Sequence, residues 1–181
     1  DLPTPPHIIR ALCEAAKDSK THGYPPYEGL LPFREAVAKW YRRKKGVSMN
    51  PEKEVLALIG SKDGIAHAPL AFIDRGDVAF VPDPGYPVYR NSITIADGIP
   101  IAMPLTFEND FVPDIERIED RTAKKAILMF INYPNNPTAA VAGENFFREV
   151  VDFAKENDVI VFHDYAYGEV TFDGYKAPSF L

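Results

Sequence analysis

The sequence predicts an α/β domain in which a mainly parallel sheet lies between two layers of helices. Four short runs of consecutive apolar residues carry this prediction, because strands buried on both faces of a parallel sheet do not alternate between apolar and polar residues. Helical segments separate several of these runs, and such alternation is typical of three-layer α/β domains. The runs comprise residues 55–59, 78–81, 127–131 and 159–162.

The other elements follow from helical periodicity and from helix start and stop signals. A first helix is predicted to begin at Pro5 and Pro6, and a second to end at Gly46, with a loop over residues 22–29 between them. Further on we expect helices near residues 62–73, 86–96 and 144–156 and a strand near residues 99–105. The sequence thus predicts a helical segment over residues 1–45 and the α/β domain over residues 46–181.

Length and composition are those of a soluble globular protein. Of the 181 residues, 46% are hydrophobic and 25% are charged, which is enough to bury a core. The net charge of −6 argues against nucleic acid or an anionic membrane as a partner. We expect no signal peptide and no membrane span, for which about 18 consecutive apolar residues are needed. The single cysteine, Cys13, is expected to pack on the apolar face of the first helix, and it suits a reducing, cytoplasmic location.

Candidate binding residues follow the predicted strands, because ligands of open α/β sheets bind at the carboxyl ends of the strands. After the first run, Gly60, Ser61 and Lys62 open a helix. Free N–H groups at a helix start attract anions, and the serine hydroxyl and the lysine cation add to this. The glycine spacing fits neither a Walker loop nor a dinucleotide-binding fingerprint. The turn is either a phosphate site or an ordinary helix cap.

The next two strand ends are rich in proline. Tyr86 follows Pro84 and Gly85 in a rigid turn, where it is either a stacking face for a flat cofactor or a core aromatic. We expect a cis peptide bond before Pro84. Two X–Pro steps within residues 132–138 fix an extended path, which positions the Asn136 amide as a donor unless the loop is purely structural.

Asp164 ends the last strand, where a carboxylate needs a cationic or donor partner. A protonated pyridine nitrogen meets that need, and the ionised acid keeps it protonated, so that a pyridoxal ring can act as an electron sink. Tyr167 lies within reach of the phenolic oxygen of such a ring, and His163 is interpreted as a supporting partner. The alternative is that Asp164 caps a following helix. The other histidines show no metal-like grouping, and we expect no metal site.

Five motifs occur in an order and spacing shared by one enzyme family. They are Tyr24 with Gly29 and Arg34, the Gly60 to Lys62 turn, the Pro84 to Pro87 turn, N-N-P-T at residues 135–138, and D-Y-A-Y at residues 164–167. With these motifs the sequence resembles the class I/II aminotransferases, pyridoxal-phosphate enzymes of fold type I, over essentially its whole length. The segments GSKDGIAH, VPDPGYPVY and NYPNNPT are similar to the corresponding segments of the LL-diaminopimelate aminotransferase group and of related alanine or aspartate aminotransferases.

The resemblance implies a fold and a reaction. The chain would be part of the three-layer large domain that binds pyridoxal phosphate, in an enzyme that transfers an amino group between an amino acid and a 2-oxo acid. Ser61 and Lys62 would bind the cofactor phosphate, and Tyr86 would stack on the pyridine ring. Asn136 would donate to the phenolic oxygen and precede a cis peptide bond to Pro137.

The remaining implied roles are catalytic or cross the subunit boundary. Asp164 would pair with the ring nitrogen, and Tyr167 would donate a hydrogen bond to the phenolic oxygen. Tyr24 would reach the phosphate held by a neighbouring subunit, because the site of this family lies across a homodimer interface. The loop over residues 22–29 is therefore expected to contact the partner of a homodimer.

The sequence departs from the family pattern in two ways. Alanine occupies position 139, where the family usually has glycine. The cofactor-linked lysine of the family belongs to an S-x-S-K segment well beyond D-Y-A-Y, and Lys176 does not stand in that context. The substrate-binding arginines and the small domain are also expected outside this sequence, which begins at Asp1 and ends at Leu181. We therefore expect an incomplete sheet and an inactive 181-residue chain with two cut ends.

Two other functions remain open at this stage. The chain is alternatively a non-catalytic module that binds pyridoxal phosphate reversibly or merely dimerises. It is otherwise part of another fold type I enzyme, such as a carbon–sulfur lyase, because the contacts to the pyridine ring are shared among these enzymes.

Overall fold

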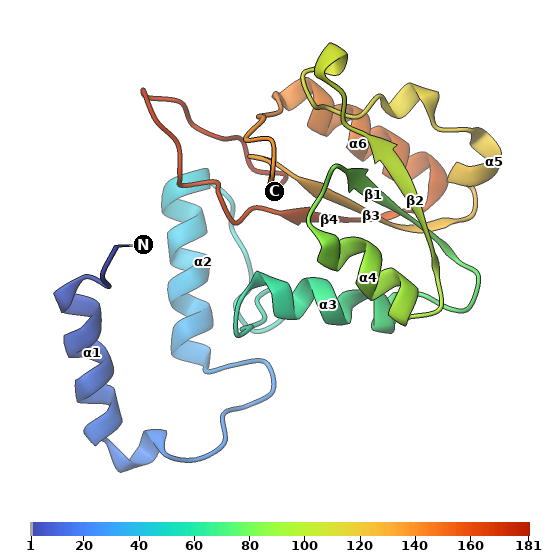
Figure 1. The fold of residues 1–181 in the computed structure, drawn as a ribbon. Helices are drawn as coiled ribbons and strands as arrows, with labels where there is room; N and C mark the ends of the chain where they lie inside the picture. The colour runs from blue at the N-terminus through green and yellow to red at the C-terminus, as the bar shows by residue number, and fades with distance from the viewer. Residues whose placement is uncertain (1) are drawn as a thin grey trace. The chain divides into compact units, whose positions relative to one another are not determined.

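The computed structural model describes residues 2–181, and the chain forms two compact units. The first unit comprises Asp1–Ala57 and the second Leu58–Leu181. Figure 1 shows their helices and strands, and each unit is described by itself below.

The first unit contains two α-helices, as the sequence predicts. Helix α1 spans Pro6–Lys17, a short 3₁₀ turn covers Ser19–Thr21, and helix α2 spans Leu31–Lys45. Helix α2 ends at Gly46, whose φ of 75° is the left-handed conformation expected beyond a helix. No residue of α1 is buried, so the expectation that Cys13 packs in a core is wrong. The reason is that the apolar face of α1 packs against no core among the described residues.

A buried arginine holds the chain around α2. Arg34 donates from Nε to the carbonyl of Gly29 at 3.1 Å and from Nη1 to the carbonyl of Pro51 at 2.7 Å. Gly29 has a φ of 88°, and a side chain there would overlap the Cβ of Ala57. This close approach explains why glycine stands at position 29.

The second unit is built on a parallel sheet of four strands. They are β1 (Val78–Asp83), β2 (Ile99–Pro104), β3 (Ala126–Asn132) and β4 (Ile160–Asp164). Their spatial order is β2-β1-β3-β4, and every neighbouring pair is parallel. The strands predicted near residues 78–81, 99–105, 127–131 and 159–162 are therefore confirmed.

The strand predicted over residues 55–59 is absent, and this prediction is wrong. A strand needs a hydrogen-bonding neighbour, and none of the four described strands pairs with this segment. The Ala57 N–H instead donates to the carbonyl of Glu28 at 3.0 Å. Leu56 and Ile59 are exposed, so here an apolar run does not mark a buried strand.

Helices cover both faces of the sheet, which makes the unit three-layered (Figure 1). Helices α3 (Ser61–Phe72) and α4 (Pro87–Ile95) pack on one face, and helix α6 (Glu144–Asn157) packs on the other. Alternate residues of β3 belong to different cores, since Leu128 and Phe130 lie with α3 and α4, and Met129 and Ile131 lie with α6. The smaller elements are α5 (Asp120–Ala123) and the 3₁₀ turns Phe107–Asn109 and Ile115–Arg117. This burial on both faces is what the continuous apolar runs predict.

Within residues 2–181, no helix is long and apolar enough to cross a bilayer.

Candidate functional site

The strand order places one end of the sheet at a topological switch point. From β1 the sheet extends to β2 on one side and to β3 on the other, and open α/β sheets bind ligands where the order reverses in this way. The turn at Pro84, the loop after Asn132 and the carboxylate of Asp164 all lie at the carboxyl ends of these parallel strands. The predicted ring-binding residues therefore come from the same end of the sheet, where the strands have their carboxyl ends.

The half-buried Asp164 carboxylate is held by two neutral donors. Its Oδ2 accepts a hydrogen bond from the Tyr89 hydroxyl at 2.8 Å, and its Oδ1 accepts one from the Ala166 N–H at 3.3 Å. The chain turns over residues 166–169 and forms no helix there, so Asp164 is not a helix cap. The alternative of a structural cap is thus not supported.

Tyr89 fixes the carboxylate and was not identified from the sequence. Its side chain is buried, its ring stacks on Phe130 with centroids 5.1 Å apart, and its edge meets Tyr86 at 5.9 Å. Burial, and next the neighbouring Asp164 carboxylate, raise the pKa of the Tyr89 hydroxyl well above its ordinary value. The hydroxyl therefore remains a donor. The available signal was its position one helical turn after Tyr86.

Asn132 links two of the predicted site residues and was also missed. Its side-chain amide donates to the Asp164 carbonyl at 2.8 Å, and its Oδ1 accepts from the Asn136 N–H at 2.7 Å. The side chain is buried, so these bonds replace hydration that it cannot have. The end of β4 and the loop after β3 are thereby tied together.

Hydrogen bonds to the Asn135 side chain hold the proline-rich loop over residues 132–138 together. The Oδ1 of this buried residue accepts hydrogen bonds from the Thr138 N–H at 3.2 Å and from its hydroxyl at 2.8 Å. Ala139 has a φ of 60°, in the left-handed region that favours glycine, which explains the usual glycine of the family motif.

Three X–Pro peptide bonds at these strand ends are cis. They precede Pro84, as predicted from the sequence, Pro137, as the resemblance implied, and Pro134, which was not predicted.

Asn136 and Tyr167 line one cavity. It has a volume of about 500 Å³, and its other walls include Pro134, Phe172 and Tyr175. Tyr167 is 41% exposed, so this residue is open to solvent. The structure thus brings together the two residues to which the resemblance assigns the phenolic oxygen.

His163 supports the same region from inside the fold. Its Nε2 donates to the Tyr133 carbonyl at 3.1 Å, and its ring lies between Phe147 and Tyr165, at 5.2 and 5.1 Å. Burial lowers the pKa of His163, although the hydrogen bond to Tyr133 and the charge of Asp164 oppose this. A neutral, packed imidazole agrees with a supporting role.

The start of α3 carries Ser61 and Lys62. Gly60 precedes it with a φ of 146°, Ser61 is its first residue, and the Lys62 ammonium lies 5.5 Å from the centre of the Tyr86 ring. The cation and the aromatic face are therefore close together, although Ser61 and Lys62 are both exposed.

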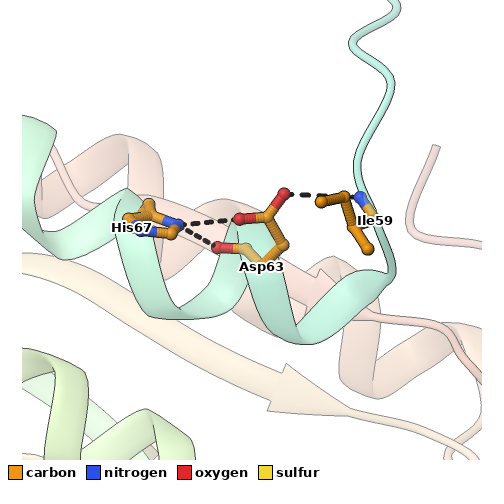
Figure 2. A network of polar contacts seen from close by, with 3 residues as sticks. All are labelled: Ile59, Asp63 and His67. Carbon is orange, nitrogen blue, oxygen red and sulfur yellow. Dashed lines mark hydrogen bonds and ion pairs between the residues drawn. The ribbon is translucent and has the colours of Figure 1, made fainter.

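An acid–histidine pair holds this turn (Figure 2). Asp63 Oδ2 accepts the Ile59 N–H at 3.4 Å, and its Oδ1 lies 2.8 Å from Nδ1 of His67. The same nitrogen lies 2.8 Å from the Asp63 carbonyl. The carboxylate of the third helical residue thus reaches back past the N-cap Gly60 to the residue before it.

Tyr24 lies in the first unit, and its side chain is fully exposed. The other predicted residues all lie in the second unit.

Another cavity contains none of the predicted residues. It has a volume of about 720 Å³ and lies beside β2, with Met103, Glu108 and Arg117 among its walls. No described group of three or more histidine, cysteine or acidic side chains has the arrangement of a metal site. The predicted ring-binding residues lie instead at the ends of β1, β3 and β4.

Comparison with known proteins adds family and fold relationships. The chain matches the sequence model of the family described as aminotransferase class I and II over residues 1–180. The LL-diaminopimelate aminotransferases of Halothermothrix orenii and Moorella thermoacetica are 53% and 56% identical to it over 181 residues. The match covers 100% of this chain and 46% of each of these proteins, so the chain spans about half the length of the curated relatives it matches.

Solved structures agree with this assignment. Substrate-bound BacF from Bacillus subtilis superposes with a TM-score of 0.95 at 46% identity, covering 99% of this chain and 46% of that one. A probable N-succinyldiaminopimelate aminotransferase from Thermus thermophilus gives a TM-score of 0.93 at 36% identity, covering 100% of this chain and 48% of that one.

Proposed function

Because this chain belongs to the class I and II aminotransferases, we propose that the protein transfers an amino group between an amino acid and a 2-oxo acid. The cofactor of this family is pyridoxal phosphate. The observation that carries the proposal is the hydrogen-bonded group at the ends of β3 and β4. There Tyr89 of α4 donates to the Asp164 carboxylate, and the Asn132 side chain donates to the Asp164 carbonyl.

The residues present fit that cofactor. The two side-chain contacts of Asp164 come from neutral donors, so a protonated ring nitrogen would supply the cation that a half-buried carboxylate favours. The face of Tyr86 offers a stacking surface for a flat ring. Asn136 and Tyr167 line one cavity, and each side chain carries a donor suited to the phenolic oxygen.

Each residue then has a distinct task. When bound, pyridoxal phosphate supplies an electron sink for the amino-acid carbanion. Asp164 holds a proton at the ring nitrogen, since an ionised carboxylate favours the protonated form of a neighbouring base. The Asn136 amide and the Tyr167 hydroxyl donate to the phenolic oxygen and so orient the ring.

The phosphate would lie at the start of α3. The first N–H groups of the helix point outward there, and the Ser61 hydroxyl and the Lys62 ammonium add a donor and a charge. The pair formed by Asp63 and His67 holds the turn that presents these groups.

We also propose that the 181-residue chain does not transaminate by itself. Its residues bind and orient the cofactor and hold a proton at the ring nitrogen. None of its lysines lies in the sequence context in which the family carries the cofactor-linked lysine, and that lysine supplies the base that moves the substrate proton. The complete activity would belong to the full-length protein.

The names of the relatives suggest the amino donor, and the exposed surfaces of the first unit suggest the assembly. LL-diaminopimelate is the proposed amino donor, because it gives the relatives at 53% and 56% identity their name. We propose a cytoplasmic homodimer in which Tyr24 reaches the phosphate bound by the partner. The full exposure of Tyr24 and the lack of buried residues in α1 support this proposal.

The test uses the purified full-length protein with pyridoxal phosphate, 2-oxoglutarate and a panel of donors comprising LL-diaminopimelate, alanine, aspartate and phenylalanine. We expect cofactor-dependent formation of glutamate, fastest with LL-diaminopimelate. If a different donor of the panel is fastest, the choice of donor is wrong and the amino-transfer proposal stands. If no donor yields glutamate although the cofactor is bound, amino transfer itself is contradicted.

A further inference from the structure

Tyr89 occupies a place that the roles assigned above do not explain. Its hydroxyl lies 2.8 Å from Oδ2 of Asp164, although the two residues are 75 positions apart in the sequence. The other oxygen, Oδ1, accepts the longer bond of 3.3 Å from the Ala166 N–H. The shorter of the two side-chain contacts of the carboxylate thus comes from helix α4, which packs on one face of the sheet.

The position of this hydroxyl is fixed by packing. Tyr89 is 1% exposed, and Phe130 stacks against its ring at an angle of 20°. Tyr86 meets the same ring edge-on, at 82°. One rigid side chain therefore contacts both the proposed stacking face and the proposed acid of the ring nitrogen.

The contact also anchors the acid strongly. Hydrogen bonds from a phenol to a carboxylate are charge-assisted and are therefore among the stronger ones. The titratable groups around the pair are Tyr86 from its own helix, Tyr167 from the turn after β4, and His163, which precedes Asp164 on β4. The Lys62 ammonium, on α3, lies above the Tyr86 ring.

On the premise of the proposed function, we propose that Tyr89 is a positioning residue that holds the Asp164 carboxylate in place and aimed at the ring nitrogen. It acts through Asp164 and touches no reacting atom. Without the hydroxyl, the carboxylate is free to turn away from the ring nitrogen, so the nitrogen would hold its proton less firmly and the ring would withdraw electrons less effectively.

The test compares Tyr89→Phe with Tyr133→Phe in the full-length protein. Both variants lose one hydroxyl from a buried tyrosine. The Tyr133 hydroxyl donates to the Phe111 carbonyl at 2.8 Å, so its loss is a matched control for a broken hydrogen bond that does not involve Asp164. The readout is the ¹⁵N resonance of the ring nitrogen in protein loaded with ¹⁵N-labelled pyridoxal phosphate.

We expect Tyr89→Phe to move this resonance toward that of neutral pyridine and Tyr133→Phe to leave it at the wild-type position. The turnover number should fall about tenfold in Tyr89→Phe, with the KM for the amino donor unchanged, because one charge-assisted hydrogen bond is lost. A Tyr89→Phe resonance identical to wild type would overturn the inference.

A second measurement covers the case in which Tyr89→Phe does not fold. Incorporation of 3-fluorotyrosine at Tyr89 keeps the ring and makes the hydroxyl a stronger donor, so the resonance should stay at the protonated position or move further from neutral pyridine. Movement toward neutral pyridine would contradict the inference. Wild-type protein that neither binds the cofactor nor forms glutamate would refute the proposed function instead, whatever the variants show.

Discussion

The two ends of the proposed cofactor site are built in different ways. At the ring end, Asn132 is 1% exposed, and its bonds to Asp164 and Asn136 are 2.8 and 2.7 Å long. At the phosphate end, the His67 side chain is 71% exposed, and the bond from the Ile59 N–H to Asp63 is 3.4 Å long. Packing thus fixes the geometry that polarises the ring, whereas local contacts at one helix start hold the phosphate turn.

This difference sets where substitutions should matter. Buried hydrogen bonds at the ring end leave unsatisfied groups when one partner is removed, which is costly. Exposed ion pairs are screened by water and contribute little. We therefore expect large, specific effects at the ring end and small ones at the phosphate turn.

The largest effect is expected for Asp164→Asn, which removes the charge that holds the ring proton. The rate of glutamate formation should fall at least about a hundredfold, since positioned proton chemistry contributes about 10²- to 10⁴-fold. The measurement is the turnover number at saturating cofactor. A rate close to that of wild type would show that the ring end does not polarise the cofactor through Asp164.

Asn132→Ala should have the next largest effect, on stability. It leaves the Asp164 carbonyl and the Asn136 N–H without their partner, and we expect a loss of about 2–4 kcal/mol in the free energy of unfolding. Urea unfolding measures this change. The matched control is Asn157→Ala, which removes one bond to the Phe153 carbonyl at the end of α6 and should cost about 1 kcal/mol. Equal losses of unfolding free energy in the two variants would show that the buried hydrogen bonds of Asn132 stabilise the fold no more than the single bond of Asn157.

His163 should make the free energy of unfolding depend on pH. Because burial lowers its pKa in the folded protein, the unfolded chain binds the proton more readily than the folded one. The stabilising effect is complete above the unfolded pKa of about 6.5 and is lost as the pH falls toward the lowered value. His163→Asn should flatten this part of the unfolding free energy measured against pH. An unchanged slope in the variant would assign the acid sensitivity to other groups.

The smallest effect is expected for Asp63→Asn at the phosphate turn. An exposed pair contributes about 0.2–1 kcal/mol, so the dissociation constant of the cofactor should rise only a few-fold. Glu144→Gln is the control, since it breaks an ion pair to Arg148 at the start of α6 and should leave cofactor binding unchanged. A loss of binding in Asp63→Asn as large as in Asp164→Asn would show that the phosphate turn is as rigidly required as the ring end.

The sequence predicts the sheet well because the relevant signal is local. Three of the four apolar runs are strands, and Tyr86, Asn136 and Asp164 lie at or just after the ends of those strands. The failure at residues 55–59 has a physical reason, since an apolar run becomes a strand only beside a hydrogen-bonding neighbour.

The supporting residues could not be predicted in the same way. Tyr89 and Asn132 contact Asp164 across 75 and 32 positions of the sequence, so their roles depend on the order of the strands in space. The cis bond before Pro84 was predictable from the tight turn, whereas the one before Pro134 was not singled out by the sequence. Local patterns thus locate the groups that face a ligand, and the fold reveals what holds them.

The most direct test is a crystal structure of the full-length protein with pyridoxal phosphate bound. We expect the ring nitrogen to lie within hydrogen-bonding distance, about 3 Å, of an Asp164 oxygen that Tyr89 also orients. We also expect the phosphate to lie at the first turn of α3. A ring nitrogen facing solvent or another residue, with Asp164 remote from the cofactor, would contradict the proposed role of Asp164.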